Sequence, residues 1–127
     1  MDWFKKKKKI IVVEDEQDIA DNIKARLELD GYIVLLAGNG KDGVDLIRKE
    51  KPSLVILDVM MPIIDGYEAC KILKRDEETK SIPILILTAL PYVNDVEKAF
   101  EVGANDFLNK PYTNERLMMK VNKLIKN

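Results

Sequence analysis

The sequence predicts an α/β domain in which helices cover both faces of a parallel sheet. Short apolar runs that are typical of buried strands alternate with longer segments of helical periodicity. The strand runs carry too few polar residues for one face to lie in water, which is typical of parallel sheets covered on both faces. The chain has 127 residues. That length is close to the common size of one domain with a single hydrophobic core.

Five segments are predicted to be strands, at residues 10–13, 32–37, 54–57, 82–87 and 106–109. The third is an unbroken apolar run that Asp58 follows directly. The first two predicted helices lie between these strands. One carries apolar residues at four-residue spacing and ends at Gly31; the next begins after Asn39 and ends before Pro52.

Three further helices complete the expected βα alternation. The third runs from about Gly66 through Leu73 to a charged turn, and the fourth is ended by Gly103. The fifth starts near Thr113. The apolar members of the last two are Val96, Ala99, Phe100 and Val102 in the fourth and Leu117, Val121 and either Leu124 or Ile125 in the fifth.

Polar side chains follow four of the predicted strands at their carboxyl ends. Glu14 and Asp15 follow the first strand, Asp58 the third, Thr88 the fourth and Lys110 the fifth. The carboxyl ends of parallel strands meet at one edge of the sheet, where ligands bind, so we expect these side chains to lie together. Hard oxygen ligands of this kind suit Mg²⁺ and phosphate groups. Taken singly, each has a structural alternative: a turn cap, a strand residue or a solvated charge.

In order and spacing, these residues resemble the receiver domain of bacterial two-component response regulators. The resemblance also includes Met61-Pro62 and Asp65-Gly66 after Asp58, and Lys110-Pro111. It implies a flavodoxin-like (βα)5 fold, with a doubly wound parallel five-stranded sheet in the order 2-1-3-4-5, and a cis Lys110-Pro111 bond. It extends from about Lys9 to the end, so we predict a basic N-terminal extension at 1–8 and the receiver domain at 9–127.

The resemblance also implies the roles of the site residues. Asp58 is the expected phosphoacceptor, and Lys110 and Thr88 contact the phosphoryl oxygens. The expected ligands of Mg²⁺ (or Mn²⁺) are Glu14, Asp15, Asp58 and the backbone carbonyl of Met60. Many members of the family carry Asp at the position of Glu14. The Glu side chain is longer but has the same charge.

A packing switch is the second implied feature. When Thr88 moves to bond the phosphoryl group, Phe107 turns inward, and the face of helix four, strand five and helix five changes. Phe107 lacks the hydroxyl of the Tyr found in other members; alternatively, it is simply a core aromatic residue. The resemblance also implies that the positions of Met60 and Leu90 flank the path of an attacking water, and because both residues are apolar we expect slow hydrolysis of the phosphoaspartate.

Three functions compete at this point. The leading one is a receiver that takes a phosphoryl group from a sensor histidine kinase or a histidine phosphotransfer protein and signals to a downstream effector. It is a signalling domain that takes part in its own phosphorylation and dephosphorylation, not an enzyme. The second is a fragment of a DNA-binding regulator; charges that resemble those pairing across that subfamily's dimer are Lys98, Glu101, Asp106 and Lys120. The third, a flavodoxin-like enzyme or nucleotide-binding module, lacks the Gly-rich loop after strand one.

The composition of the chain limits the classes of partner that we expect. The net charge is −1, so no global field favours direct nucleic-acid binding, and without a long apolar stretch we expect no membrane insertion and a cytoplasmic protein. The chain has no histidine, so the phosphoryl donor must be another molecule. Cys70 is the single cysteine, expected to be packed in a helix. The lysines at 5–9 beside Trp3 and Phe4 are expected to be a solvated tail; the alternative is contact with an anionic membrane or nucleic acid.

Overall fold

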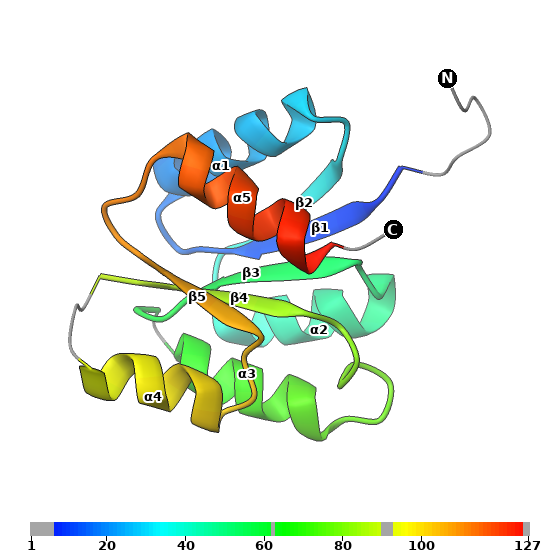
Figure 1. Ribbon diagram of the computed structural model, residues 1–127. Helices are drawn as coiled ribbons and strands as arrows, with labels where there is room; N and C mark the ends of the chain where they lie inside the picture. Colours follow the sequence, from blue (N-terminus) through cyan, green and yellow to red (C-terminus); the bar gives the residue numbers. More distant parts are fainter. Residues whose placement is uncertain (1–6, 62, 90–92, 126–127) are drawn as a thin grey trace.

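The computed structural model describes residues 7–61, 63–89 and 93–125, without the side chains of 93–96. Within these ranges, a five-stranded parallel sheet lies between two layers of helices (Figure 1). The order β2-β1-β3-β4-β5 confirms the predicted fold class and topology. The strands are β1 (Lys9–Val13), β2 (Ile33–Ala37), β3 (Leu54–Asp58), β4 (Ile84–Thr88) and β5 (Asp106–Asn109).

The helices divide between the two faces of the sheet. Figure 1 shows α1 (Gln17–Leu29) and α5 (Asn114–Leu124) on one face. The other face is covered by α2 (Gly40–Glu50), α3 (Gly66–Arg75) and α4 (Val93–Glu101). The predicted helix ends agree with these bounds, since Asn39 and Thr113 cap α2 and α5, and Gly31 and Gly103 have positive φ angles of 91° and 94°. Over the described ranges, no helix has the length and apolar character needed to cross a membrane.

Every strand except β5 differs from the prediction by one or two residues at an end. Strand β1 begins one residue earlier, at Lys9, and β3 ends one residue later, at Asp58. Strand β2 begins at Ile33, because the Tyr32 N–H closes the turn after α1 by donating to the Leu27 carbonyl. Strand β4 begins at Ile84 and includes Thr88, because Pro83 has no N–H to donate to the ladder. The side chain of Phe100 was expected on the apolar face of its helix but is 50% exposed, and that of Val96 lies outside the described residues.

The pleat of the strands sends alternate side chains into two separate cores. On β1, Ile11 and Val13 face the core shared with α2, α3 and α4, whereas Ile10 and Val12 face the core shared with α1 and α5. Strands β3, β4 and β5 alternate in the same way. Because this period of two continues to the last residue of each strand, it also decides to which face a strand-end side chain belongs. Cys70 is fully buried in the first core, as predicted.

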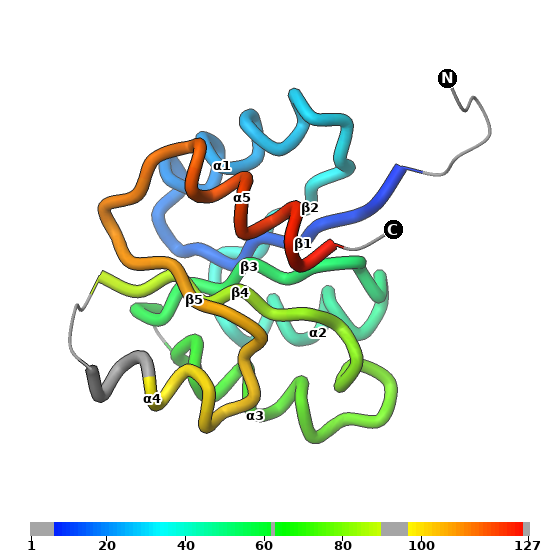
Figure 2. The backbone as a smooth tube through the Cα atoms, viewed as in Figure 1, coloured from blue at the N-terminus to red at the C-terminus, as the bar shows by residue number. Residues whose placement is uncertain are grey.

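The loop after β3 returns to the end of the strand from which it leaves. The Gly66 N–H donates to the Val59 carbonyl at 3.0 Å, and the Asp65 side chain caps α3 by accepting from the Glu68 N–H at 2.9 Å. A Cβ on Gly66 would lie 2.3 Å from the carbonyl oxygen of Asp58. Figure 2 shows that β1, β3, β4 and β5 all end at the same side of the sheet.

The close approach at Gly66 gives a test of the fold around Asp58. We expect Gly66→Ala to lower the free energy of unfolding by about 1–3 kcal/mol, because the new methyl group meets backbone atoms that cannot move aside. Gly38→Ala is the control, since nothing lies within 4 Å of its Cβ. Urea unfolding followed by circular dichroism measures both. Equal stabilities of the two variants would show that the loop does not pack as described.

Candidate functional site

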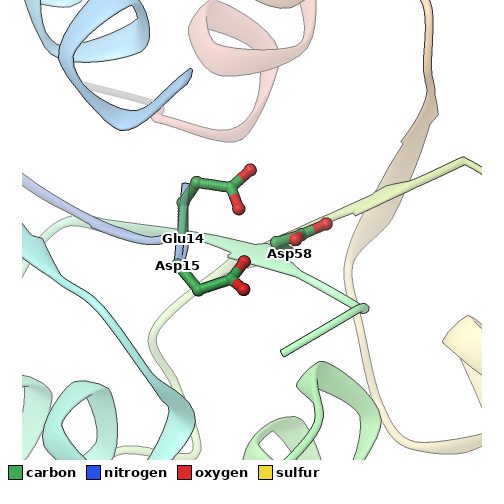
Figure 3. Close-up of side chains that lie close together, drawn as sticks. All are labelled: Glu14, Asp15 and Asp58. Carbon is green, nitrogen blue, oxygen red and sulfur yellow. The ribbon is translucent and has the colours of Figure 1, made fainter. Parts of the chain in front are cut away.

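Strands β1 and β3 are neighbours, and their ends bring three carboxylates together (Figure 3). Glu14 and Asp15 follow β1, and Asp58 ends β3. Each offers an oxygen within 4.8 Å of the others. Glu14 and Asp58 are only 3% exposed, whereas Asp15 is exposed. The sequence therefore predicted correctly which acidic residues meet.

Lys110 supplies the positive charge of this cluster. Its Nζ donates to Asp58 Oδ1 at 3.1 Å and to Glu14 Oε1 at 3.4 Å. Lys110 follows β5, which is separated from β3 by β4, so its side chain reaches across one strand. The Lys110 backbone N–H donates to the Thr88 carbonyl at 2.7 Å, and this bond fixes the backbone position from which the side chain extends. The Lys110-Pro111 bond is cis, as expected.

Burial and mutual charge set the protonation of the cluster. Burial, and then the hydrogen bond and charge of Asp58, raise the pKa of Glu14 to about 7. Burial alone would lower the pKa of Lys110, but the hydrogen bonds and charges of Asp58 and Glu14 outweigh it, and the net direction is upward. Lys110 is therefore a firmly charged ammonium ion beside a carboxyl group that titrates near neutral pH.

The pleat places Asp58 and Thr88 on opposite faces of the sheet. Asp58 is the last residue of β3 and continues the alternation of Leu54 and Ile56, whose side chains face the core with α1 and α5, and Lys110 contacts it from beyond the end of β5. Thr88 continues the alternation of Ile84 and Ile86, which face the core with α3 and α4. Thr88 is 1% exposed and ends β4.

Phe107 lies on the same face as Thr88. In the register of β4 and β5, Phe107 pairs with Ile86, and Thr88 pairs with Asn109. Each pair is two residues from the other along its strand, so Phe107 and Thr88 point to the same face. The Phe107 ring packs edge-on against Phe100 of α4, with centroids 5.9 Å apart and an interplanar angle of 87°. The ammonium group of Lys120 lies 5.6 Å from the centroid of Phe107. This ring therefore connects α4 and α5 across β5.

The chain matches the family of response regulator receiver domains over residues 10–122. It is 41% identical over 120 residues to the probable transcriptional regulator ycf27 of Porphyra purpurea, covering 94% of this chain and 48% of that protein. The DNA-binding dual master transcriptional regulator RpaA of Synechocystis is 38% identical over 118 residues, 93% of this chain and 49% of that protein. This chain belongs to the response regulator receiver family. It spans about half the length of these curated relatives.

Solved structures agree with the family at the level of the fold. One is the receiver domain of a sensor histidine kinase from Pseudomonas aeruginosa, which holds a magnesium ion in its active site cleft. Its TM-score is 0.87 at 29% identity, over 94% of this chain and 98% of that chain. The protein described here is thus a receiver, a signalling domain with the flavodoxin-like fold, as the sequence predicted.

The acidic cluster of this receiver fits a divalent cation. Two buried carboxylates and one exposed carboxylate present oxygen atoms that lie within 4.8 Å of one another. Hard oxygen ligands of this kind are the ones that Mg²⁺ prefers. The raised pKa of Glu14 reflects its burial and then the neighbouring Asp58, and a dication between the two acids would favour their ionised forms. Glu14, Asp15 and Asp58 are the side chains that would hold it. The fourth expected ligand, the backbone carbonyl of Met60, remains a prediction.

The four charges that were predicted as a possible dimer face lie on α4, β5 and α5. Lys120 donates to both carboxylate oxygens of Asp106 at 3.0 Å within the same chain. Lys98 lies 4.7 Å from the ring centroid of Tyr67, toward α3. Glu101 is exposed. Asp106 and Lys120 thus pair within the chain, and a role for these residues in a dimer remains a prediction.

Some predicted features fall on residues that the structure does not describe. These are Pro62, Leu90 and the extension that holds Trp3, Phe4 and the first lysines of the run. Of the two residues expected to slow hydrolysis, Met60 is described, and it is 66% exposed at the start of the loop after β3. Slow hydrolysis remains a prediction.

One residue beside the site was missed in the sequence. Tyr112 lies two positions after Lys110, and burial raises the pKa of its hydroxyl. It lines a pocket together with Lys110 and residues of α1 and α5. Its place directly after the Lys110-Pro111 motif was the available signal, but a tyrosine in a loop has no distinctive pattern.

The protonation of Glu14 predicts a pH dependence of stability in metal-free protein. The folded-state pKa of about 7 lies above the ordinary value of 4.5, so the folded protein keeps this proton where the unfolded chain has lost it. The contribution of Glu14 is therefore fully present below about pH 4.5 and is lost as the pH rises to 7, with a slope of at most about 1.4 kcal/mol per pH unit. Relative to Glu14→Gln, the wild type should lose stability over this range.

Urea unfolding in the presence of a chelator, from pH 4.5 to 7.5, measures the difference between wild type and Glu14→Gln. Glu16→Gln is the control, because Glu16 is exposed beside the site. A stability difference for Glu14→Gln that stays constant with pH would contradict the assignment.

Proposed function

We propose that Asp58 is the phosphoacceptor of this receiver and that the phosphoryl group comes from a histidine of a partner kinase or phosphotransfer protein. The observation that carries this is the Lys110 ammonium group, held 3.1 Å from a buried Asp58 carboxylate. A buried carboxylate with a fixed cation beside it is a nucleophile with a charge ready for the incoming phosphoryl oxygens. The chain has no histidine of its own to act as donor.

The chemical step forms one bond and breaks one. An Asp58 oxygen attacks phosphorus, and the bond between phosphorus and the donor nitrogen breaks with its electron pair left on that nitrogen. Lys110 exchanges part of its hydrogen bonding from Asp58 to a phosphoryl oxygen, and Thr88 is the proposed contact of another. When bound by Glu14, Asp15 and Asp58, Mg²⁺ would neutralise phosphoryl charge and order the oxygens for in-line attack.

The partners follow from the family and from the site. We propose a cytoplasmic receiver, at residues 9–127 after a basic extension at 1–8, that is loaded by a sensor histidine kinase or phosphotransfer protein and is read by a downstream effector. A second candidate is the receiver part of a longer transcriptional regulator, with a homodimer formed on phosphorylation. It is supported by the relatives, which are named as transcriptional regulators and are about twice as long.

The acceptor assignment predicts the behaviour of one variant and one chelation experiment. Wild type incubated with Mg²⁺ and acetyl phosphate should gain the mass of one phosphoryl group in intact-protein mass spectrometry. Asp58→Asn should gain none, because an amide is not a nucleophile for phosphorus, and removal of Mg²⁺ should prevent labelling of the wild type. The matched control is Asp65→Asn, which changes the cap of α3 in the same loop. Full labelling of Asp58→Asn would overturn the assignment.

The readout is proposed to pass through β4 to the opposite face of the sheet. Thr88 and Phe107 share that face, and Phe107 contacts Phe100 of α4 and Lys120 of α5. If Thr88 turns its hydroxyl toward the phosphoryl group, it leaves space on this face, and the Phe107 ring can fill that space. Inward rotation would break the ring contact with Phe100 and would uncover Lys120, so the surface of α4, β5 and α5 would change.

This coupling predicts different results for phosphorylation and for readout. Beryllofluoride, a phosphoryl mimic, should shift the NMR signals of α4, β5 and α5 in the wild type. In Thr88→Ala these shifts should be largely lost, although Asp58 should still accept phosphate from acetyl phosphate. Ser81→Ala, an exposed hydroxyl variant, is the control. Signals on this face that do not respond in the wild type would refute the switch.

A further inference from the structure

A basic extension leads into the sheet at the end opposite the acidic site. Lys9 begins β1, whereas Asp58 ends the neighbouring parallel strand β3, so the two residues lie at opposite ends of the sheet. Lys7, the first residue of the extension that the structure describes, is exposed. Figure 1 shows that α1 ends on the same side of the sheet as the start of β1. A partner of the extension would therefore lie away from Asp58.

The last two lysines of the run contact the domain. The Lys8 carbonyl accepts from the Ile33 N–H at 2.9 Å, and Lys9 Nζ donates to Glu50 Oε1 at 2.8 Å. The charge of Lys9 is thus balanced by a neighbouring carboxylate. The lysines at 5–7 precede these contacts in the chain, and they are the charges that would meet a partner.

The extension joins positive charge to aromatic side chains. Trp3 and Phe4 directly precede the lysines, and Trp3 is the only tryptophan of the chain. Each lysine near an anionic membrane strengthens binding about five-fold, so the lysines at 5–7 amount to about 100-fold. Trp and Phe side chains favour the boundary between lipid head groups and acyl chains. Both kinds of residue therefore suit the same partner, a bilayer that contains anionic lipids.

Two apolar side chains of the domain are exposed at the same end. Leu29, the last residue of α1, is 81% exposed, and Ile33, the first residue of β2, is 42% exposed. Ile33 pairs with Lys9 in the register of β1 and β2, so this apolar surface adjoins the extension. A single-stranded nucleic acid would also attract lysines and aromatic rings, but it has no apolar interior to receive aliphatic side chains. Glu28 is exposed beside Leu29, so the extension carries the attraction to negative charge.

We propose that the extension, together with the apolar surface at Leu29 and Ile33, binds this receiver to the surface of an anionic lipid bilayer. Trp3 and Phe4 enter the head-group region, and the lysines at 5–7 contact the lipid phosphates. The contact is peripheral, because side chains enter the bilayer surface and the chain does not cross it. The acidic site stays in water at the other end of the sheet. This binding does not depend on phosphorylation of Asp58.

The single tryptophan reports directly on the extension. Vesicles of equal parts phosphatidylcholine and phosphatidylglycerol should shift the emission of Trp3 to the blue, because its ring leaves water, and should sediment the protein with them. Vesicles of phosphatidylcholine alone should do neither. Raising the ionic strength from about 0.1 M to about 1 M should release the protein, because the Debye length falls from about 10 Å to about 3 Å.

Variants divide the binding between charge and apolar contact. Replacing the lysines at 5–7 by Gln should lower partitioning to the anionic vesicles about 100-fold. The matched control replaces three exposed lysines of α2 and α3 by Gln, with the same change in net charge and the wild-type affinity expected: Lys41, Lys49 and Lys71. Leu29→Ser should weaken partitioning about three- to ten-fold, because one aliphatic side chain no longer enters the bilayer surface. Circular dichroism checks that the variants are folded.

Several results would overturn the proposal. Unchanged emission of Trp3 with anionic vesicles would show that the extension is a solvated tail. Equal partitioning of the 5–7 variant and its control would remove the lysines from the contact, and wild-type partitioning of Leu29→Ser would remove the apolar surface. Tighter binding to a single-stranded oligonucleotide than to the vesicles would replace the lipid by nucleic acid. Asp58→Asn should bind vesicles like the wild type, so failure of the phosphoacceptor assignment is a separate result.

Discussion

The site depends on one ammonium group placed between two buried carboxylates. Glu14 and Asp58 are each 3% exposed, and Lys110 donates to both. Two buried acids this close repel each other, and the raised pKa of Glu14 shows that repulsion and desolvation persist even with the lysine present. A divalent cation that entered the site would find carboxylate oxygens already gathered, and a phosphoryl group would find the Lys110 ammonium group.

The geometry that makes this possible is the parallel sheet with β4 between β3 and β5. Lys110 reaches across β4, and its backbone N–H is bonded to the Thr88 carbonyl on the way. Thr88 of β4 therefore has two roles: its backbone carbonyl holds Lys110 in place, and its side chain is the proposed readout hydroxyl. The pleat directs Asp58, the proposed phosphoacceptor, toward α1 and α5, and the proposed readout residues Thr88 and Phe107 toward α3 and α4. We infer that the end of β4 is where a change at Asp58 passes through the sheet.

The sequence predicted the parts of this site that local patterns determine. Apolar runs located the strands, and the polar residue after each run identified Glu14, Asp15, Asp58, Thr88 and Lys110. The parallel arrangement brings Glu14, Asp15, Asp58 and Lys110 together, whereas the side chain of Thr88 follows Ile84 and Ile86 to the other face of the sheet. Features that depend on distances between segments could not be predicted in this way. The raised pKa of Glu14 depends on its burial and on the approach of Asp58, and the pocket at Tyr112 depends on the packing of α1 against the loop before α5.

The surroundings of several surface side chains also depend on contacts between distant segments. Lys98 lies over the Tyr67 ring, and the half-exposed Phe100 contacts Phe107, because helices α3, α4 and strand β5 approach one another only in the folded protein. A charge at helical spacing does not reveal its partner. The pairing of Asp106 with Lys120 within the chain likewise follows from the position of α5 against β5.

The most direct measurement of the central claim is to locate the phosphoryl group among the three neighbouring carboxylates. Phosphorylated protein is reduced with borohydride, which converts an acyl phosphate into an alcohol, and the digested peptides are sequenced by tandem mass spectrometry. We expect the reduced residue to be Asp58, with Glu14 and Asp15 unchanged. Reduction at Glu14 or Asp15, or at a carboxylate outside the site, would contradict it.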